Sequence, residues 1–392
     1  MTAAPRRAGS ERDAVGGVAP AEVARPDTVQ ELVDVLRAAT ADGLAVVPVG
    51  GGTKTCWAAP PTRCDLVLDT TGLDRIVEHT AGDLVVVAQA GVPLAMLQES
   101  VAPAGQLLAL DPPEVGATLG GVVSANASGP RRLRYGTVRD LLIGVTVVLA
   151  DGTIASAGGK VVKNVAGYDL GKLYTGAHGT LGVVVSTTWR LHPRPPAMRV
   201  VLADLPSAGA AGPAALALHR STLTPSAIEL RAGPGRSPQL VVLFEGLEAS
   251  VTHQAEVAAS LVGGSVAATL PDRFGVRPGG AEDLMLRLAF APASLAEVLA
   301  ALPPGSDVAA SAGSGIAYLA VAAEAGVTAL PGLRAALAAH DGSAVVLAAP
   351  PHLRAGLDHW GPVGDALDLM RRVKDRFDPQ RRLSPGRFVG GL

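Results

Sequence analysis

Three glycine-rich segments punctuate the first half of this sequence, and they constrain its fold more than any other feature. The first segment, Gly50-Gly51-Gly52-Thr53, follows an apolar run over 45–49. The second covers 111–129, where adjacent glycines stand among Pro, Ser, Thr and Asn, and the third runs from 162 to 185. Because glycine accepts positive φ angles and carries no Cβ, each segment allows sharp turns and a close approach of the backbone to a ligand.

The apolar pattern around these segments predicts an α+β protein with two main domains. Residues 1–23 are expected to be disordered. Helical spacing over 29–36 predicts a helix, short apolar runs at 65–68 and 84–88 predict strands, and two β runs around Asp151-Gly152 predict a hairpin. The segment 111–129 is expected to be a long loop. The proline-rich stretch 191–196 marks a domain boundary, and beyond it strands alternate with Ala/Leu-rich helices to about residue 350.

Composition excludes several classes of function. Of the 392 residues, Lys and Arg number 33 and Asp and Glu 35, and only 3% are aromatic, so we expect no nucleic-acid partner. Cys56 and Cys64 are too few for a disulfide framework or an iron–sulfur cluster, and we expect no metal site and a reducing, cytoplasmic location. No signal-peptide pattern and no long apolar stretch is present, so the expected protein is soluble, with peripheral attachment to a membrane through a complex left open.

The first two glycine-rich segments have a chemical interpretation and a structural one. Successive N–H groups at Gly50–Thr53 can converge on a pyrophosphate, but an isolated glycine run is also a common flexible turn. The segment is not a Walker A loop, because Thr53 stands where Gly would precede Lys54, and no G-x-G-x-x-G pattern opens a helix. In the second segment, small residues admit a flat ring while Thr118, Ser124, Asn126 and Ser128 offer hydrogen bonds. A tightly packed structural loop is the alternative.

Taken in this order, the three segments resemble the FAD-binding domain of the vanillyl-alcohol oxidase / p-cresol methylhydroxylase (PCMH-type) flavoproteins. Within that family, GPRR at 129–132, KNVAGYDL at 163–170 and HPRP at 192–195 are most similar to the FAD-binding (E) subunits of bacterial glycolate oxidase, also called glycolate dehydrogenase. The ending over 376–388 resembles the family's FDP…NPG pattern, with Ser384 at the position where Asn is usual.

This resemblance implies a domain plan and a cofactor. Residues 24–195 would form a PCMH-type FAD-binding domain of two α/β subdomains, 196–350 an α+β cap, and 351–392 a segment that returns to the FAD domain. The FAD is expected to be non-covalent, because Thr53 follows Gly52 where covalently flavinylated relatives often have His. The implied FAD-binding residues are Gly50, Gly51, Gly52, Thr53, Pro112, Thr118, Gly120, Gly121, Ser124, Asn126, Gly129, Gly182, Val183 and Val184.

The implied activity is the oxidation of glycolate to glyoxylate by hydride transfer to FAD. The chain would act as one subunit of a complex, beside a second flavoprotein subunit and an iron–sulfur subunit, since two cysteines cannot ligate a cluster. Alternatives are a stand-alone FAD-dependent D-lactate or other 2-hydroxy-acid dehydrogenase, and a FAD-binding relay subunit without substrate chemistry.

The catalytic residues are not evident from the sequence. The late histidines His340, His352 and His359 form no His-x-His pair and are expected to be surface or packing residues. Arg231, Arg287 and Tyr318 are candidates for the substrate-facing side of the cap, with ordinary structural roles as the alternative. The basic run Arg131, Arg132 and Arg134 is expected to lie in a solvated loop, with contact to a phosphate or a partner subunit as the alternative.

Overall fold

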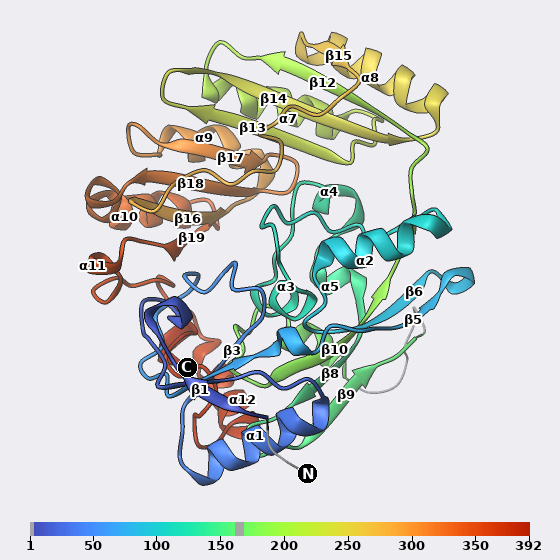
Figure 1. Cartoon of the computed structure of the whole chain (residues 1–392). Coiled ribbons are helices and arrows are strands. Elements are labelled where there is room, and N and C mark those ends of the chain that lie inside the picture. Colours follow the sequence, from blue (N-terminus) through green and yellow to red (C-terminus); the bar gives the residue numbers. More distant parts are fainter. Residues whose placement is uncertain (1–3, 161–167) are drawn as a thin grey trace.

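The computed structural model describes residues 4–160 and 168–392. The chain forms a lower part with two sheets and an upper cap with one large sheet, and its last segment returns to the lower part (Figure 1). The first sheet has the order β1-β2-β4-β3, with β2, β4 and β3 parallel and β1 antiparallel to β2. Its elements are β1 (Arg6–Ala8), β2 (Glu22–Ala24), α1 (Val29–Ala41), β3 (Val46–Val49) and β4 (Leu66–Asp69).

Two features of this first sheet concern the predictions made from the sequence. The expected helix is confirmed as α1, which begins at an N-cap where the Thr28 side chain accepts from the Glu31 N–H and which buries Leu32 and Leu36. The expected disorder of residues 1–23 is wrong for its described part, residues 4–23. There β1 and β2 pair, and Val15 and Val23 are buried in one apolar cluster, so these short strands gain both hydrogen bonds and burial.

The second sheet of the lower part is antiparallel, in the order β5-β6-β10-β8-β9. Its strands are β5 (Ile76–Thr80), β6 (Val85–Gln89), β8 (Leu142–Val148), β9 (Ile154–Gly158) and β10 (Val183–Arg190), and β7 (Gln106–Leu107) pairs with β11 (His192–Pro193). The predicted hairpin is β8–β9, with Gly152 at a φ of 80° in its turn. The helices are α2 (Leu94–Val101), α3 (Leu119–Ala125), α4 (Arg132–Tyr135), α5 (Val138–Leu141) and α6 (Leu170–Tyr174).

Helix α3 corrects the prediction that residues 111–129 are one long loop. Leu119, Val122 and Val123 are fully buried, and the helix lies on β6 and β10. Gly120 makes this approach possible, because a Cβ on it would lie 2.8 Å from the Cβ of Ala90. The density of glycine and small residues therefore marks close helix–sheet packing here rather than the absence of secondary structure.

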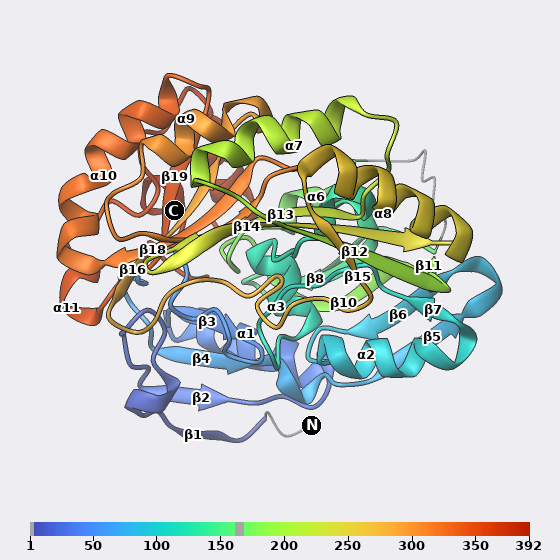
Figure 2. The same ribbon diagram turned by 90° about the horizontal axis from the view of Figure 1, so that it is seen from above.

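The cap contains one eight-stranded antiparallel sheet in the order β15-β12-β14-β13-β17-β18-β16-β19. Its strands are β12 (Ala197–Asp204), β13 (Ala227–Gly233), β14 (Arg236–Gly246), β15 (Ser265–Ala267), β16 (Asp283–Ala289), β17 (Asp307–Ser311), β18 (Ile316–Ala322) and β19 (Ser343–Ala348). The helices α7 (Ala211–Arg220), α8 (Glu248–Val262), α9 (Leu295–Ala300) and α10 (Ala323–Ala338) lie together over one face of this sheet (Figure 2). The opposite face contacts the lower part through a cluster that includes Trp57, Ala125 and Leu347.

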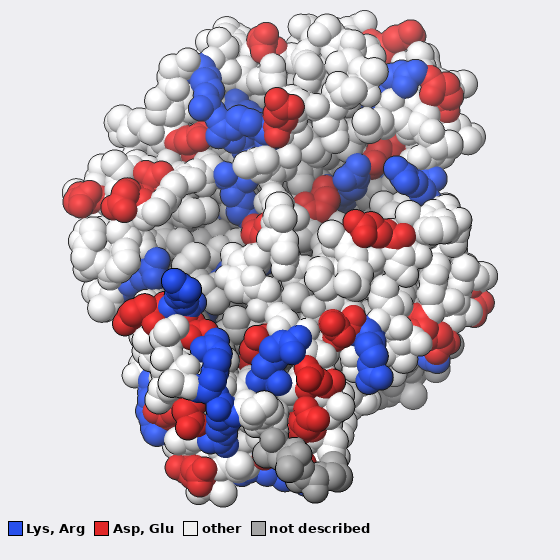
Figure 3. All heavy atoms as spheres, viewed as in Figure 1, with Lys and Arg blue, Asp and Glu red and all other residues white. Residues whose placement is uncertain are grey.

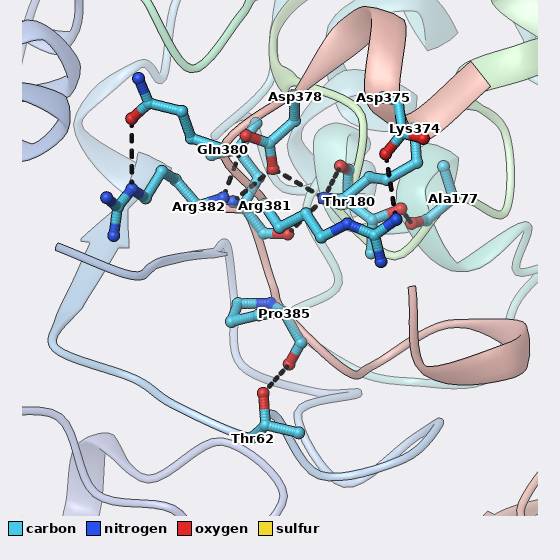
Figure 4. Close-up of polar contacts among 11 residues, drawn as sticks. Thr62, Ala177, Thr180, Lys374, Asp375, Asp378, Gln380, Arg381, Arg382 and Pro385 are labelled. Atoms are coloured by element: carbon cyan, nitrogen blue, oxygen red, sulfur yellow. Dashed lines mark hydrogen bonds and ion pairs between the residues drawn. The ribbon is translucent and has the colours of Figure 1, made fainter. Parts of the chain in front are cut away.

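The C-terminal segment contains α11 (Pro351–Arg354) and α12 (Leu367–Phe377), and Lys374 of α12, which forms a buried ion pair within the segment, joins it to the lower part through the Thr180 carbonyl (Figure 4). The Lys374 ammonium donates to the Asp378 carboxylate at 2.7 Å and to the carbonyls of Thr180 at 2.6 Å and Leu383 at 3.0 Å. Leu383 then forms a parallel bridge beside Val46 of β3. The tail thus extends the first sheet next to the strand that leads into Gly50.

Short 3-10 turns complete the described structure. They are η1 (Glu11–Asp13), η2 (Thr70–Gly72), η3 (Ala81–Asp83), η4 (Ala102–Ala104), η5 (Ala208–Ala210), η6 (Pro292–Ser294) and η7 (Val389–Gly391). No helix in the described ranges combines the length and the apolar character that crossing a bilayer requires.

Candidate active site

A cavity lies where β3 ends, between the first glycine-rich segment and the start of α3. The four residues Gly50–Thr53 line it from one side, and Thr118, Gly121 and Ser124 line it from the other. The third segment contributes Gly179, and the returning tail contributes Arg387. All three glycine-rich segments therefore meet at this one cavity.

The local backbone at this cavity suits a pyrophosphate-bearing cofactor. A Cβ on Gly50 would lie 2.1 Å from the Thr118 hydroxyl oxygen, and one on Gly51 would lie 2.0 Å from the Gly116 carbonyl oxygen. Gly52 has a φ of 70°, in the left-handed region that glycine tolerates best. Two loops can come this close only without side chains, which leaves backbone N–H groups as the lining that an anion meets.

Buried polar atoms without a partner support the same interpretation. Among the described residues, Asn126 Oδ1, Ser128 Oγ and Ser384 Oγ are buried and lack a hydrogen bond. Buried polar atoms in proteins are normally paired. Of these three, Ser384 Oγ lies next to the cavity, 3.3 Å from where a Cβ on the lining residue Gly179 would be.

The structure places the other predicted cofactor residues outside the lining of this cavity. They are Pro112, Gly120, Asn126, Gly129, Gly182, Val183 and Val184. Val183 and Val184 are buried in two apolar cores, and a Cβ on Gly129 would lie 2.0 Å from the Asp111 carbonyl oxygen, so packing already explains these three positions. Contact of this group with the cofactor stays a prediction.

Several lining residues of the cavity were missed in the sequence, among them His178 and Arg387. His178 precedes Gly179 and lines the cavity; burial lowers its pKa to about 3, assisted by the charges of Arg387 and Arg287. Arg387 donates to the carbonyl of Trp57 at 2.6 Å, and burial lowers its pKa to about 10. The tail pattern around Pro385-Gly386 was the available signal for Arg387, since it implied that the chain returns to this domain.

Three arginines gather around one tyrosine of the cap sheet: Arg287 on β16, Arg277 on the connection before β16, and Arg132 on α4 of the lower part. Arg277 lies with its guanidinium carbon 3.9 Å from the centroid of the Tyr318 ring, and Arg132 lies 3.4 Å from the Tyr318 hydroxyl. Arg287 is the direct cross-strand neighbour of Tyr318. Burial alone would raise the pKa of Tyr318, but the charges of Arg277, Arg132 and Arg287 outweigh it and lower that pKa.

Only one of these three arginines has an ion pair among the described residues. Arg277, with 8% of its side chain exposed, pairs with Glu114, which Lys54 also approaches at 3.5 Å. Its guanidinium also lies over the ring of Trp57, at 4.9 Å from the centroid. Arg132 donates to backbone carbonyls, and no carboxylate in the described ranges pairs with it or with Arg287. The junction therefore carries positive charge that is not neutralised locally.

A buried carboxyl group completes this side of the cap. Glu229 on β13 is 4% exposed, and its Oε1 has no hydrogen-bond partner among the described residues. Burial raises its pKa to about 7, opposed by Ser311 on the neighbouring strand β17. Glu229 is therefore a group that exchanges protons near neutral pH.

The basic run expected to be solvated instead joins the two parts. Arg131 forms a bidentate pair with Glu245 of β14, at 2.8 Å in its shortest contact, and Arg134 donates to the Glu245 carbonyl. The prediction was wrong for Arg131 and Arg132, which the cap, remote in sequence, partly covers, whereas Arg134 is exposed.

The late histidines do not meet at this junction. His359 is buried, with its Nδ1 3.0 Å from the Leu357 carbonyl, and His352 is exposed.

Comparison with known proteins identifies two domains. Residues 20–158 match the model described as FAD binding domain, and residues 358–388 match FAD linked oxidases, C-terminal domain. The glycolate oxidase subunit GlcD of Bacillus subtilis (strain 168) is 34% identical over 211 residues, which cover 54% of this chain and 45% of GlcD. D-2-hydroxyglutarate dehydrogenase of Xanthomonas citri pv. viticola is 36% identical over 48% of this chain and 40% of its own length. The glycolate oxidase subunit GlcE of Escherichia coli (strain K12) is 36% identical over 43% of this chain and 48% of GlcE.

The similarity to these relatives spans less than half of their length, whereas the fold matches nearly throughout. The crystal structure of p-cresol methylhydroxylase with substrate bound superimposes with a TM-score of 0.75 at 15% identity, covering 94% of this chain and 88% of that one. This confirms the predicted α+β, PCMH-type architecture. The chain therefore contains a FAD binding domain and a C-terminal domain of FAD linked oxidases, has the fold of p-cresol methylhydroxylase, and uses FAD as its cofactor.

Proposed function

We propose that this chain oxidises a small 2-hydroxy acid, with glycolate as the favoured substrate, and that it does so as the FAD-binding subunit of a glycolate oxidase complex. One observation carries the substrate class: Arg132 and Arg287 lie against Tyr318 at the domain junction with no carboxylate partner among the described residues. Two unneutralised guanidinium groups favour an anionic ligand, and a carboxylate suits their planar donors. The similarity to glycolate oxidase subunits supports glycolate within that class.

The residues have distinct proposed roles. Gly50–Thr53 and the segment from Thr118 to Gly129 hold FAD without a covalent bond, and bound FAD accepts the hydride from the α-carbon. Arg132 and Arg287 hold the substrate carboxylate, with the Tyr318 hydroxyl as a further polar contact. Glu229 Oε1 accepts the proton of the substrate hydroxyl, because a pKa of about 7 makes its carboxylate a stronger base than an ordinary one while a large fraction is still ionised at neutral pH.

Anaerobic mixing tests this assignment. Glycolate should bleach the flavin of this chain within the assembled complex, and Arg287→Gln should raise the glycolate concentration for half-maximal bleaching about tenfold or more, because it removes a charge-assisted contact. Arg220→Gln, at the exposed end of α7, is the matched control and should leave that concentration unchanged. Absence of bleaching by any 2-hydroxy acid would contradict the proposal and favour a FAD-binding relay subunit.

A stand-alone 2-hydroxy-acid dehydrogenase is the second candidate. The similarity to D-2-hydroxyglutarate dehydrogenase favours it, as does the buried Arg277 Nη2, which has no partner among the described residues and lies where a second carboxylate could bind. Dye reduction by the purified chain with D-lactate or D-2-hydroxyglutarate would support this candidate. Activity that appears only with a second flavoprotein and an iron–sulfur subunit would support the complex, for which we propose a cytoplasmic location, peripheral at the inner face of the membrane.

A further inference from the structure

A second cavity, here called the cap pocket, lies on the cap sheet away from the glycine-rich segments. Its volume is about 300 Å³, and its charged lining consists of Arg231, Arg236, Arg273, Asp272 and Asp307. Strands β13, β14 and β17 form its floor, and residues 271–273 of the long connection between β15 and β16 form one wall. In Figure 3, Lys and Arg side chains gather beside Asp and Glu side chains on this upper part of the cap.

Some charged groups of the cap pocket have ion-pair or hydrogen-bond partners, and one of them, Arg231, lacks a partner for one nitrogen. Asp307 pairs with Arg273 at 3.1 Å. Arg231 donates through one nitrogen to the Val276 carbonyl, while its Nη2 is buried and has no partner among the described residues. Burial lowers the pKa of Arg231 and the like charge of Arg273 lowers it further, while the charges of Asp307 and Glu229 oppose this shift.

We propose that the cap pocket binds a small oxyanion, the phosphate or carboxylate group of a metabolite, between Arg231 and Arg273 with Arg236 at its rim. Such a group supplies the acceptor that Arg231 Nη2 lacks and offsets the repulsion between the two arginines. Three arginines face two aspartates across the lining, so one negative charge balances the pocket. This site is separate from the FAD cavity and does not depend on the proposed activity.

An anion bound in the cap pocket would also affect the position of Arg277. The connection that carries Arg273 is anchored by Phe274 in the apolar cluster on the sheet, and Arg231 holds the carbonyl of Val276, the residue before Arg277. An anion bound to Arg231 and Arg273 fixes this connection from both sides. Because Arg277 stacks over Trp57, the emission of that tryptophan reports on the change.

The test is a titration of the FAD-loaded, full-length protein with inorganic phosphate and, separately, with succinate, at constant ionic strength. We expect saturable binding of at least one anion, followed by tryptophan emission, and we expect Trp57→Phe to remove the signal. Arg231→Gln and Arg273→Gln should each weaken binding about tenfold or more, because each removes a charge-assisted hydrogen bond. Preference for phosphate or for succinate identifies the metabolite class.

Two controls separate the cap pocket from other cationic sites. Arg220→Gln, exposed on the cap, and Arg287→Gln, at the domain junction, should leave the affinity for the anion within about twofold. If neither anion binds, or if binding survives both Arg231→Gln and Arg273→Gln, the inference is wrong. If Arg287→Gln alone weakens anion binding, the anion binds at the domain junction, and the inference about the cap pocket is also wrong. Since Arg273 is on an irregular connection, its variant provides the test even if Arg231→Gln fails to fold.

Discussion

Replacing Lys374 by Met should loosen the C-terminal segment from the FAD domain. The substitution keeps the length of the side chain but removes three hydrogen bonds, to Thr180, Asp378 and Leu383. Only 1% of the Lys374 side chain and none of Asp378 is exposed, so water cannot replace the lost partner. The Asp378 carboxylate is then left buried without a counter-ion.

The cost follows from this burial. Removing one partner of a buried ion pair typically costs ~3–5 kcal/mol. Asp378 keeps two backbone donors, the N–H groups of Arg382 at 3.0 Å and Leu383 at 2.8 Å, so the lower end of that range applies. We therefore expect a loss of about 3 kcal/mol in the free energy that holds the tail in place.

Hydrogen exchange at Val46 measures this loss directly. The Val46 N–H donates to the Arg382 carbonyl at 2.8 Å, so it exchanges only when the tail detaches. A loss of about 3 kcal/mol predicts exchange faster by roughly two orders of magnitude. Arg371→Met is the matched control on the same helix: its ion pair with Asp368 is exposed, and Val46 should keep its protection. Exchange accelerated by less than tenfold in Lys374→Met would refute this reasoning.

Three further predictions address other parts of the molecule. The pKa of Glu229 is about 7 in the folded protein against an ordinary 4.5, so the stability that its protonation provides is complete below pH 4.5 and is lost as the pH rises through 7. Above pH 7, Glu229→Gln should therefore be more stable than the wild type, by up to about 3 kcal/mol in the free energy of unfolding, and should have a higher Tm. A difference in Tm that does not depend on pH would contradict the raised pKa. Gly51→Ala should weaken FAD binding at least about tenfold, measured by flavin fluorescence, because its Cβ meets the Gly116 carbonyl, whereas Gly82→Ala, with nothing within 4 Å, should not. Arg131→Gln should cost about 3 kcal/mol in urea denaturation by leaving Glu245 buried and unpaired, and an unchanged midpoint, as expected for the exposed Arg139→Gln, would show that this pair does not join the two parts.

The sequence predicts those features of the fold and site that depend on local chemistry. Helix α1 has a capping Thr28 and apolar residues at helical spacing, and β8–β9 has an Asp-Gly turn, so both could be found within a short window. Gly50–Gly52 alone left a pyrophosphate site and a flexible turn open, and the resemblance to PCMH-type flavoproteins favoured the cofactor site; the structure places these glycines in a cavity lining. The same logic fails at Gly120, where glycine serves helix packing and not a loop.

Arg287 and Tyr318 were candidates for the cap face, and the structure places both at the domain junction, but their grouping with Arg132 and Arg277 could not be derived in this way. Arg132, Arg277 and Tyr318 come from α4, from an irregular connection and from β18, and only the cap sheet brings them together. Arg277 has no periodic pattern around it, and its neighbours Trp57 and Glu114 are remote in sequence. Long-range pairing of strands decides such contacts, and no single sequence window contains that information.

The lining of the FAD cavity has a consequence for biosynthesis. Gly50 and Arg387 meet in it, although 336 residues separate them along the chain. During translation, Gly50–Thr53 leaves the ribosome long before Leu383, the tail residue that forms a bridge beside β3. We therefore expect flavin loading to follow translation of the tail, and a chain truncated shortly before residue 387 should bind FAD more weakly than the full chain.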